Sequence, residues 1–310
     1  MTPAFLFPGQ LSEFVGMGRD FFEREPGARE LFDLTSRRCG RDMQALLFAG
    51  PKEALGENLA AQAGVYLVST LAAHALARRG IEPPATAGYS LGNYAAMVAA
   101  GAVSYEDALE VLVAVWRETE RLGVVGAMGA VVGVRRELLE AVCEELRGRG
   151  LAVWIGNVNS NTQFVLTGET DAVAAALEAL APRALSVLPL TMSWPIHSEL
   201  MLPVARAVAP VVAACSTIRD PRVPYYGPDG TVARTAEAIR RHLATEFCHQ
   251  TLWNATFEAM IRDGFRGFLE VGPGKMICRM SRWIDRSVAC REAGTLETID
   301  EASRILRESQ

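Results

Sequence analysis

The serine at position 90 lies between two glycines, in the segment Gly88-Tyr89-Ser90-Leu91-Gly92, which fits the pattern G-x-S-x-G. Where such a pattern joins a strand to a helix, a tight turn lifts the serine hydroxyl into the open, and glycines permit the strained backbone. The N–H of Leu91 would then point to where an oxyanion develops, at the start of the helix. The pattern alone is common, but its position between an apolar run and a helical run favours a nucleophilic serine.

A nucleophilic serine needs a base, and the chain has four histidines. His197 follows a proline and a strand-like segment, so it can present its ring at the end of a strand or loop. His74 lies in an amphipathic helical run and is expected to be structural or exposed. His242 and His249 lie in a charged stretch that is typical of a solvated helix face. His197 is therefore the preferred base, and a simple loop histidine is the alternative reading of it.

The elements that must position these residues alternate between short apolar runs and long amphipathic ones, which is typical of an α/β fold. Strands are expected at residues 3–9, 86–90 and 264–272, and helices at 54–79, 91–101 and 104–122. Between residues 126 and 190 the order becomes β-α-β-β-α-β, which indicates a ferredoxin-like unit. We therefore predict a large domain of residues 1–125 and 191–310, with a small subdomain of residues 126–190 inserted in it.

The composition limits the class of protein. The chain has 310 residues, of which 50% are hydrophobic, and a formal net charge of −5. This size allows a large core, and the mild acidity argues against nucleic acid as a partner. No run of about 18 apolar residues and no signal-peptide pattern occur, so we expect a cytoplasmic protein without a membrane span. The cysteines form no C-x-x-C pair, which predicts reduced thiols and no metal site; they are Cys39, Cys143, Cys215, Cys248, Cys278 and Cys290.

Six motifs occur in a fixed order along nearly the whole chain. They are FLFPGQ at residues 5–10, GYSLGNYAA at 88–96, GAMGAVVG at 126–133, NVNSNTQFVLTG at 157–168, PIHSELM at 195–201 and FLEVGPGKM at 268–276. Together they resemble the malonyl-CoA:acyl carrier protein transacylases, the family that also includes the acyltransferase domains of polyketide synthases. The resemblance implies an α/β-hydrolase-like large domain with a ferredoxin-like small subdomain, in agreement with the order of elements above.

The resemblance also implies roles for individual residues. Ser90 would take the acyl group from a thioester in a ping-pong reaction, with His197 as base and then acid. The backbone N–H groups of Gln10 and Leu91 would hold the oxyanion, and Gln62 would lie in the substrate pocket. In the family a backbone carbonyl orients the histidine. The implied substrates are thioesters of phosphopantetheine, on an acyl carrier protein or possibly CoA, with no bound cofactor.

The chain departs from the family in the pocket that receives the acyl group. Tyr89 replaces the usual histidine beside the nucleophile, and Trp194 and Ile196 are expected to reshape the channel before His197. Malonyl-specific members pair the malonyl carboxylate with an arginine on the helix after the turn. An ungapped alignment puts Val115 at that position. Arg117 is two residues further, about 200° around the helix, so it does not substitute without a change of register.

An unpaired carboxylate in an apolar pocket costs several kcal/mol, so we expect an acyl group other than malonyl. The leading hypothesis is a discrete, trans-acting acyltransferase of polyketide or antibiotic biosynthesis, resembling the vicenistatin-type transferases that act between carrier proteins. The alternatives are a malonyl transferase, a proofreading thioester hydrolase and a catalytically silent interaction module. We expect a monomer. Acidic carrier proteins would dock on exposed arginines, for which the candidates are Arg147, Arg149, Arg206, Arg282 and Arg286.

Overall fold

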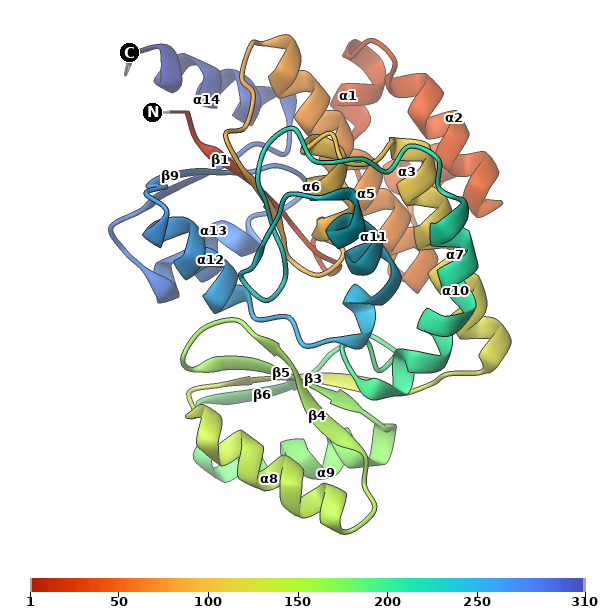
Figure 1. The fold of residues 1–310 in the computed structure, drawn as a ribbon, viewed down its shortest axis with the longest axis vertical. Coiled ribbons are helices and arrows are strands. Elements are labelled where there is room, and N and C mark those ends of the chain that lie inside the picture. The colour runs from red at the N-terminus through yellow and green to blue at the C-terminus, as the bar shows by residue number, and fades with distance from the viewer. Residues whose placement is uncertain (1, 309–310) are drawn as a thin grey trace.

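The computed structural model describes residues 2–308 and contains two β-sheets. Figure 1 shows the smaller sheet with its two helices below the rest of the chain. The larger sheet is parallel apart from its last strand. Its order is β10 (Ala289–Glu292), β9 (Gly267–Glu270), β1 (Ala4–Phe7), β2 (Thr86–Gly88), β7 (Tyr225–Tyr226) and β8 (Val232–Ala233).

Strand β1 lies inside this sheet because its four residues are all apolar and buried. It pairs in parallel with β2, where Phe7 lies opposite Gly88, and with β9 on its other side. The loops that follow β1 and β2 therefore leave the same edge of the sheet side by side. In open parallel sheets, ligands bind at such an edge, outside the carboxyl ends of strands whose connections run in opposite directions.

Helices surround the larger sheet. In chain order they are α1 (Arg19–Arg24), α2 (Ala28–Cys39), α3 (Met43–Ala49), α4 (Lys52–Leu55), α5 (Asn58–Arg78), α6 (Gly92–Ala99), α7 (Tyr105–Leu122), α10 (Leu202–Ala214), α11 (Ala236–Thr245), α12 (Trp253–Arg262), α13 (Met276–Ile284) and α14 (Leu296–Glu308), with 3₁₀ turns η2 (Glu199–Met201) and η3 (Glu246–Cys248). The expected helix at 54–79 is divided into α4 and α5. The side chain of Ser104 caps α7, accepting a hydrogen bond from the N–H of Asp107.

Helix α5 is the central helix of the core. Among residues 2–308 it is the one helix whose length and hydropathy would suit a membrane span, but 94% of that apolar window is buried inside the structure. Its neighbours include α6, α7 and α2. The apolar character of α5 therefore serves packing on all sides, as expected of a helix that is hydrophobic all around.

The smaller sheet has the antiparallel order β4 (Val153–Val158), β5 (Gln163–Gly168), β3 (Ala127–Val132) and β6 (Ser186–Pro189). Helices α8 (Arg136–Gly148) and α9 (Thr170–Leu180) cover its outer face, and η1 (Ala181–Arg183) follows α9 (Figure 1). This order is that of a ferredoxin-like unit, so the predicted α/β fold class is confirmed. We propose that the domain limits are those the sequence predicts, residues 126–190 for the small subdomain.

The prediction that all six cysteines are reduced is wrong for one pair. Cys278 on α13 and Cys290 on β10 form a disulfide, with their Cα atoms 5.2 Å apart. The sequence separates them by 12 residues, and the turn from α13 into the edge strand β10 brings them together. The remaining four cysteines are free and buried.

Candidate active site

Ser90 lies on the sharp turn between β2 and α6, with a left-handed backbone conformation (φ 52°). The turn needs its two glycines because a side chain at either position would clash with backbone atoms. A Cβ atom on Gly88 would lie 2.2 Å from the backbone N of Asn93, and one on Gly92 would lie 2.0 Å from the carbonyl oxygen of Phe7. Such a backbone is rare for a residue other than glycine and is found where the surroundings impose it, often at functional sites. The local sequence therefore builds the turn that the G-x-S-x-G pattern predicts.

His197 is the histidine that the structure brings to Ser90. Its Nε2 atom lies 2.7 Å from the Ser90 Oγ atom, and its Nδ1 atom lies 2.9 Å from the carbonyl oxygen of His249. A carbonyl only accepts hydrogen bonds, so Nδ1 carries the proton and Nε2 presents its lone pair to the serine hydroxyl. Burial lowers the pKa of His197 to about 4, against the smaller upward effect of the His249 carbonyl. The imidazole is therefore neutral at pH 7.

The smaller sheet holds the segments around His197 in place. The N–H of Val158 at the end of β4 donates to the carbonyl of Thr251, and the N–H of Thr251 donates to the carbonyl of Gly156. On the neighbouring strand β5, the hydroxyl of Thr167 donates to the carbonyl of Ile196 over 2.8 Å. The backbone of His197 has a positive φ of 66° and its N–H donates to the carbonyl of Phe247. The segments around His197 are thus held by β4, β5 and η3, and sequence reasoning assigned no role to Thr167 or Thr251.

Gln10 and Leu91 line the same cavity as Ser90. Both follow paired strands, and within residues 2–308 neither N–H donates to a backbone carbonyl. Leu11, directly after Gln10, also has a positive φ, of 74°. The structure therefore brings together two amides with the serine and histidine, at the start of α6 where the helix dipole favours negative charge.

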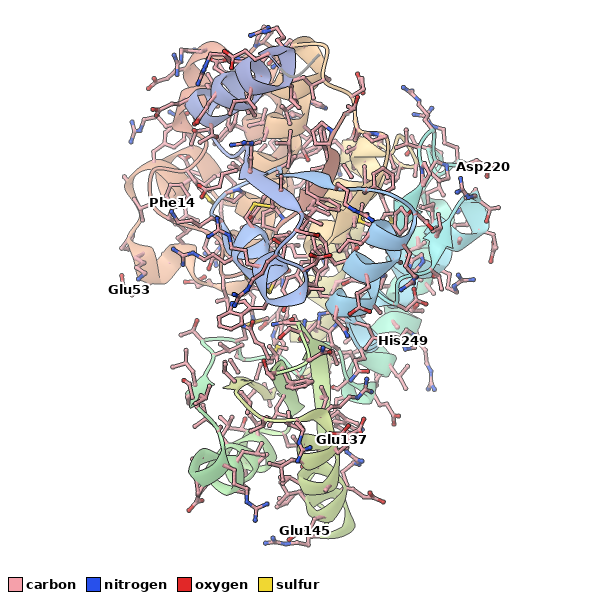
Figure 2. The ribbon with its side chains drawn as sticks, turned by 90° about the vertical axis from the view of Figure 1, so that its left-hand side faces the viewer. Phe14, Glu53, Glu137, Glu145, Asp220 and His249 are labelled. Carbon is pink, nitrogen blue, oxygen red and sulfur yellow. A yellow bond between two sulfur atoms is a disulfide. The ribbon has the colours of Figure 1, made fainter. Side chains whose placement is uncertain are left out.

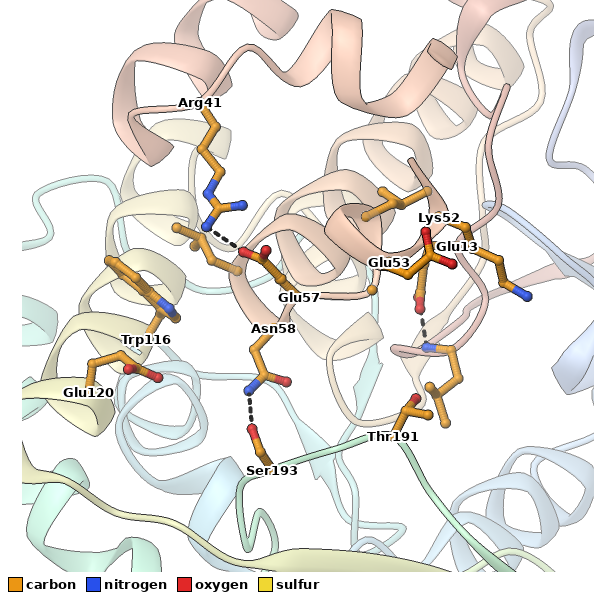
Figure 3. Close-up of a pocket in the computed structure, with 14 residues that line it drawn as sticks. Glu13, Arg41, Lys52, Glu53, Glu57, Asn58, Trp116, Glu120, Thr191 and Ser193 are labelled. Carbon is orange, nitrogen blue, oxygen red and sulfur yellow. Dashed lines mark hydrogen bonds and ion pairs between the residues drawn. The ribbon is translucent and has the colours of Figure 1, made fainter. Parts of the chain in front are cut away.

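A chain of side-chain amides positions the loop that carries Gln10. The Nε2 of Gln62 donates to Oε1 of Gln10 over 3.1 Å, and the Nε2 of Gln10 donates to Oδ1 of Asn58 over 3.2 Å. Asn58 in turn donates to Oγ of Ser193, as Figure 3 shows. These bonds connect the loop after β1 with α5 and with the segment that leads to His197. They hold the Gln10 backbone near Ser90.

A narrow cavity of about 30 Å³ lies against Ser90. Gln62, Val115 and Ile196, three of the residues expected in the substrate pocket, line it. The other lining residues are Gln10, Leu91, Tyr94, Leu112, Met201, Glu246 and Phe247, and this lining includes no lysine or arginine. Arg117 is exposed on α7. No cation of the described residues therefore stands where the family has its arginine.

Tyr89 and Trp194 differ from their expected places, because neither belongs to the lining of this cavity. Tyr89 is buried behind the turn, where its hydroxyl donates to Oδ1 of Asn159 and its ring meets Trp253 edge-on. Trp194 is buried in the main hydrophobic core. Both side chains support the turn or the core, and neither forms a wall of the cavity at Ser90.

The charged stretch at 240–250 is not the solvated helix face that the sequence predicts. His242 is buried on α11, where its ring meets Tyr225 edge-on, and the side chain of Glu246 is directed inward. His249 and His74 are exposed. The hydrophobic residues Leu243 and Phe247 flank these polar ones and pack into the core. Sequence reasoning therefore missed Glu246 as a site residue, because its burial depends on the distant elements packed around η3 and not on the residues next to it.

A larger cleft of about 900 Å³ opens next to the chain of amides (Figure 3). Asn58 and Ser193 lie where the cleft approaches Gln10, and Trp116 of α7 forms another part of its wall. An ion pair between Arg41 and Glu57 crosses its rim. The cleft shares no lining residue with the cavity at Ser90, and the hydrogen bond between Gln10 and Asn58 links the walls of the two.

The arginines predicted to receive a carrier protein lie in different places. Arg147 and Arg149 are at the end of α8, where Arg147 donates to the carbonyl of Val153 and Arg149 pairs with Glu145. Figure 2 shows Glu145 at the tip farthest from the larger sheet, while His249 lies at the junction of the two sheets. These two arginines are therefore remote from the site. Arg206 is exposed on α10, and Arg282 and Arg286 are exposed at the end of α13.

A second groove, of about 530 Å³, lies beside the Gln10 loop. Arg279 of α13 and Lys275, just before that helix, line it on one side, and Leu11 and Phe14 line it from the loop after β1. The exposed ring of Trp283 completes its wall.

No group of three His, Cys, Asp or Glu residues within positions 2–308 is arranged to hold a metal ion.

The similarity to known proteins extends over both sheets. The family model described as acyl transferase domain matches residues 4–277. The malonyl CoA-acyl carrier protein transacylase of Bacillus subtilis (strain 168) is 33% identical over 312 residues, which cover 98% of this chain and 97% of the relative. The solved structure of the malonyl CoA-acyl carrier protein transacylase from Coxiella burnetii matches with a TM-score of 0.91 at 30% identity, over 98% of each chain.

A further similar solved structure contains a transacylase together with its carrier protein. It holds a type II PKS acyl-carrier protein in complex with its malonyl-transacylase, which matches with a TM-score of 0.92 at 29% identity, over 98% of this chain and 100% of that one. The fold of this chain is thus that of solved transacylases in both its larger and its smaller unit.

Proposed function

The chain belongs to the acyl transferase domain family, and from this premise we propose that it takes an acyl group from a thioester onto Ser90 and passes it to the phosphopantetheine thiol of an acyl carrier protein. Transfer of acyl groups to carrier proteins is what the names of its relatives have in common. The observation that carries the proposal for this chain is the 2.7 Å contact between Ser90 Oγ and the lone pair of His197 Nε2.

In the first half-reaction, Ser90 Oγ attacks the carbonyl carbon of the thioester while His197 Nε2 takes the hydroxyl proton. The carbonyl oxygen becomes an oxyanion, which the N–H groups of Gln10 and Leu91 stabilise. The C–S bond then breaks, and the proton passes from His197 to the sulfur of the leaving thiol. The products are an acyl ester on Ser90 and a free thiol.

In the second half-reaction, the thiol of the carrier protein gives its proton to His197 Nε2 and its sulfur attacks the ester carbonyl. The same two amides hold the second oxyanion, and the C–O bond to Ser90 breaks as the proton returns to the serine oxygen. Water in place of the thiol would make the protein a hydrolase. The hydrogen bond from Nδ1 to the His249 carbonyl keeps the ring in the tautomer that both steps need.

The test is to incubate the protein with acyl-CoA and acyl carrier protein thioesters and to weigh the intact protein. We expect an added acyl mass that is lost from Ser90→Ala and kept in Ser287→Ala, because Ser287 is an exposed loop residue bonded to Asp285. The added mass should move to a carrier protein when one is supplied. Release of free acid without transfer would instead favour the proofreading hydrolase, and no labelling of Ser90 would overturn the proposal.

Two cargoes are supported by different observations. The relatives are named malonyl CoA-acyl carrier protein transacylases, which supports malonyl as the acyl group. The lining of the cavity at Ser90 supports a cargo without a terminal carboxylate, because Val115 stands at the arginine position of the alignment and no cation replaces it. A malonyl group bound there would leave its carboxylate unpaired in a mostly apolar cavity, at a cost of several kcal/mol.

The substitution Val115→Arg separates these cargoes. If the wild-type cavity disfavours malonyl, the variant should raise the ratio of malonyl to acetyl loading on Ser90, measured by competition and intact mass. Efficient malonyl loading by the wild-type protein would instead establish malonyl transfer. A role in polyketide or antibiotic assembly stays a prediction, which the likeness to a transacylase bound to a type II PKS carrier protein supports.

We further propose that the carrier protein docks over the groove beside the Gln10 loop. Lys275 and Arg279 offer positive charge there, and Leu11, Phe14 and Trp283 offer exposed apolar surface. In Figure 2, α13 faces the viewer and Phe14 lies to its left. An acidic carrier protein suits such a surface because opposite charge speeds association and fixes orientation.

A further inference from the structure

The disulfide between Cys278 of α13 and Cys290 of β10 is accessible from two grooves at the edge of the larger sheet. The grooves have volumes of about 490 and 760 Å³, and both cysteines line each of them. Both residues are partly exposed, whereas the four free cysteines are buried. A dissolved thiol can therefore reach this S–S bond.

Positive charge surrounds the disulfide. The arginines that line both grooves are Arg279, Arg282 and Arg291, and Arg286 lines the larger one. Within residues 2–308, the side chains of these four arginines form no ion pair. The acids of the lining are Glu292 and Glu301, and Glu292 already lies 3.8 Å from the Nζ atom of Lys275. The two grooves therefore have an excess of unpaired positive charge, which suits an anionic ligand.

The free cysteines cannot compete in thiol chemistry at neutral pH. Burial raises the pKa of the thiols of Cys39, Cys143 and Cys215 to about 11, and that of Cys248 to about 12. They stay protonated, and the thiolate is the reactive form. At the disulfide, the neighbouring guanidinium groups favour a thiolate, which makes either cysteine a better leaving group. Exchange is thus confined to the Cys278–Cys290 pair.

We propose that the Cys278–Cys290 disulfide is a modification site that exchanges with thiols bearing phosphate groups, and that CoA is such a thiol. The CoA thiol first gives its proton to solvent, and its sulfur then attacks one cysteine sulfur. The S–S bond of the protein breaks, and the other cysteine leaves as a thiolate that takes up a proton. The product is a mixed disulfide between the protein and CoA, and a second CoA thiolate would release CoA disulfide and leave both cysteines reduced.

The arginines give this exchange its selectivity, because guanidinium groups bind phosphate through paired hydrogen bonds. Opening of the bond removes the cross-link between α13 and β10. The exchange does not depend on acyl transfer, so it goes beyond the proposed function.

The test compares CoA with pantetheine, which has the same thiol arm without phosphate groups. Protein purified without reductant is mixed with each thiol at low salt and quenched with N-ethylmaleimide, and intact mass gives the fraction of opened disulfide. We expect CoA to open the bond at least tenfold faster, because opposite charge speeds association. The difference should disappear in about 0.5 M salt, which screens charges beyond a few ångströms.

Charge reversal tests the role of the arginines. The double substitution Arg282→Glu, Arg291→Glu should bring the two rates within about twofold of each other. The matched control is Arg149→Glu, Arg183→Glu on the smaller unit, where both arginines are exposed, and it should keep the wild-type ratio. The melting temperature shows whether each variant is folded, and the wild-type ratio tests the proposal even if the reversal variant is not.

The cysteines are assigned with Cys278→Ser, Cys290→Ser, which should gain neither CoA nor a maleimide label. Labels that persist in this variant would overturn the proposal, as would labelling of wild-type protein before any thiol is added. Failure of both thiols to open the bond, equal wild-type rates for the two, or a preference that survives charge reversal in folded protein would also overturn it. Acylation of Ser90 is measured separately, so each of these results leaves the proposed function standing.

Discussion

The substitution Gly92→Ala tests whether the geometry of the turn is what makes Ser90 reactive. A Cβ atom at this position would lie 2.0 Å from the carbonyl oxygen of Phe7, whereas real Cβ atoms essentially never approach closer than 3.0 Å. The backbones of β1 and of the turn must therefore separate by about 1 Å. Gln10 follows Phe7 and Leu91 precedes Gly92, so this separation moves apart the two amides that would hold the oxyanion.

A misplacement of 1 Å costs about 100-fold in the rate of a reaction that depends on alignment. We therefore expect the rate of Ser90 acylation to fall about 100-fold, with a loss of about 1–3 kcal/mol in the free energy of unfolding from overpacking. Acylation is followed by rapid quenching and intact mass, and stability by denaturant titration.

The control is Gly148→Ala on α8, where an added Cβ meets nothing within 4 Å. It should leave the rate unchanged and stabilise the helix by about 0.5–1 kcal/mol. If Gly92→Ala does not fold, Gly88→Ala repeats the test, because its Cβ would lie 2.2 Å from Asn93. Acylation at the wild-type rate in a folded variant would refute the argument.

Three further predictions follow from charges in the structure. Burial lowers the pKa of His197 to about 4, so the rate of acylation by an uncharged acyl thioester should fall less than about twofold between pH 7 and 5.5. A roughly tenfold loss of rate, as for an ordinary histidine of pKa about 6.5, would contradict the burial argument. Burial raises the pKa of Glu246 to about 8, so the folded protein keeps a proton that the unfolded chain has lost, and the free energy of unfolding should fall by up to about 2 kcal/mol as the pH rises from 6.5 to 8. Glu246→Gln should remove this part of the pH dependence, as measured by denaturant titration. Arg279→Glu in the groove beside the Gln10 loop should raise KM for the carrier protein about tenfold without slowing acylation by a small thioester. Arg149→Glu at the tip of α8 should change neither quantity, and equal effects of the two substitutions would show that the groove is not the docking surface.

Local patterns were sufficient for much of the fold. The apolar residues of β1, the glycines around Ser90 and the cap at Ser104 act over a few residues, so their consequences can be read from neighbouring letters. The ferredoxin-like order of residues 126–190 is likewise a matter of alternating periodicity. His197 could be preferred over three other histidines because it alone follows a strand-like segment.

The same local reading failed where burial depends on distant neighbours. Glu246 and His242 belong to a charged run, and only the packing of α11 and η3 against β7 and α6 turns them inward. Tyr89 is adjacent to Ser90 in sequence, yet contacts with Asn159 and Trp253 draw its side chain away from the cavity. The disulfide between Cys278 and Cys290 depends on the return of the chain to the sheet edge.

The sequence by itself thus determined that a serine stands on a tight turn and that a valine replaces an arginine on the following helix, because both are properties of short segments. Only the tertiary structure decided what surrounds that valine. The cavity is closed by α6 and α7 together with η3, which lies more than a hundred residues further along the chain. This closure sets a buried acid beside Ser90. Desolvation acts on a group through everything packed around it, so it cannot be read from the letters next to Glu246.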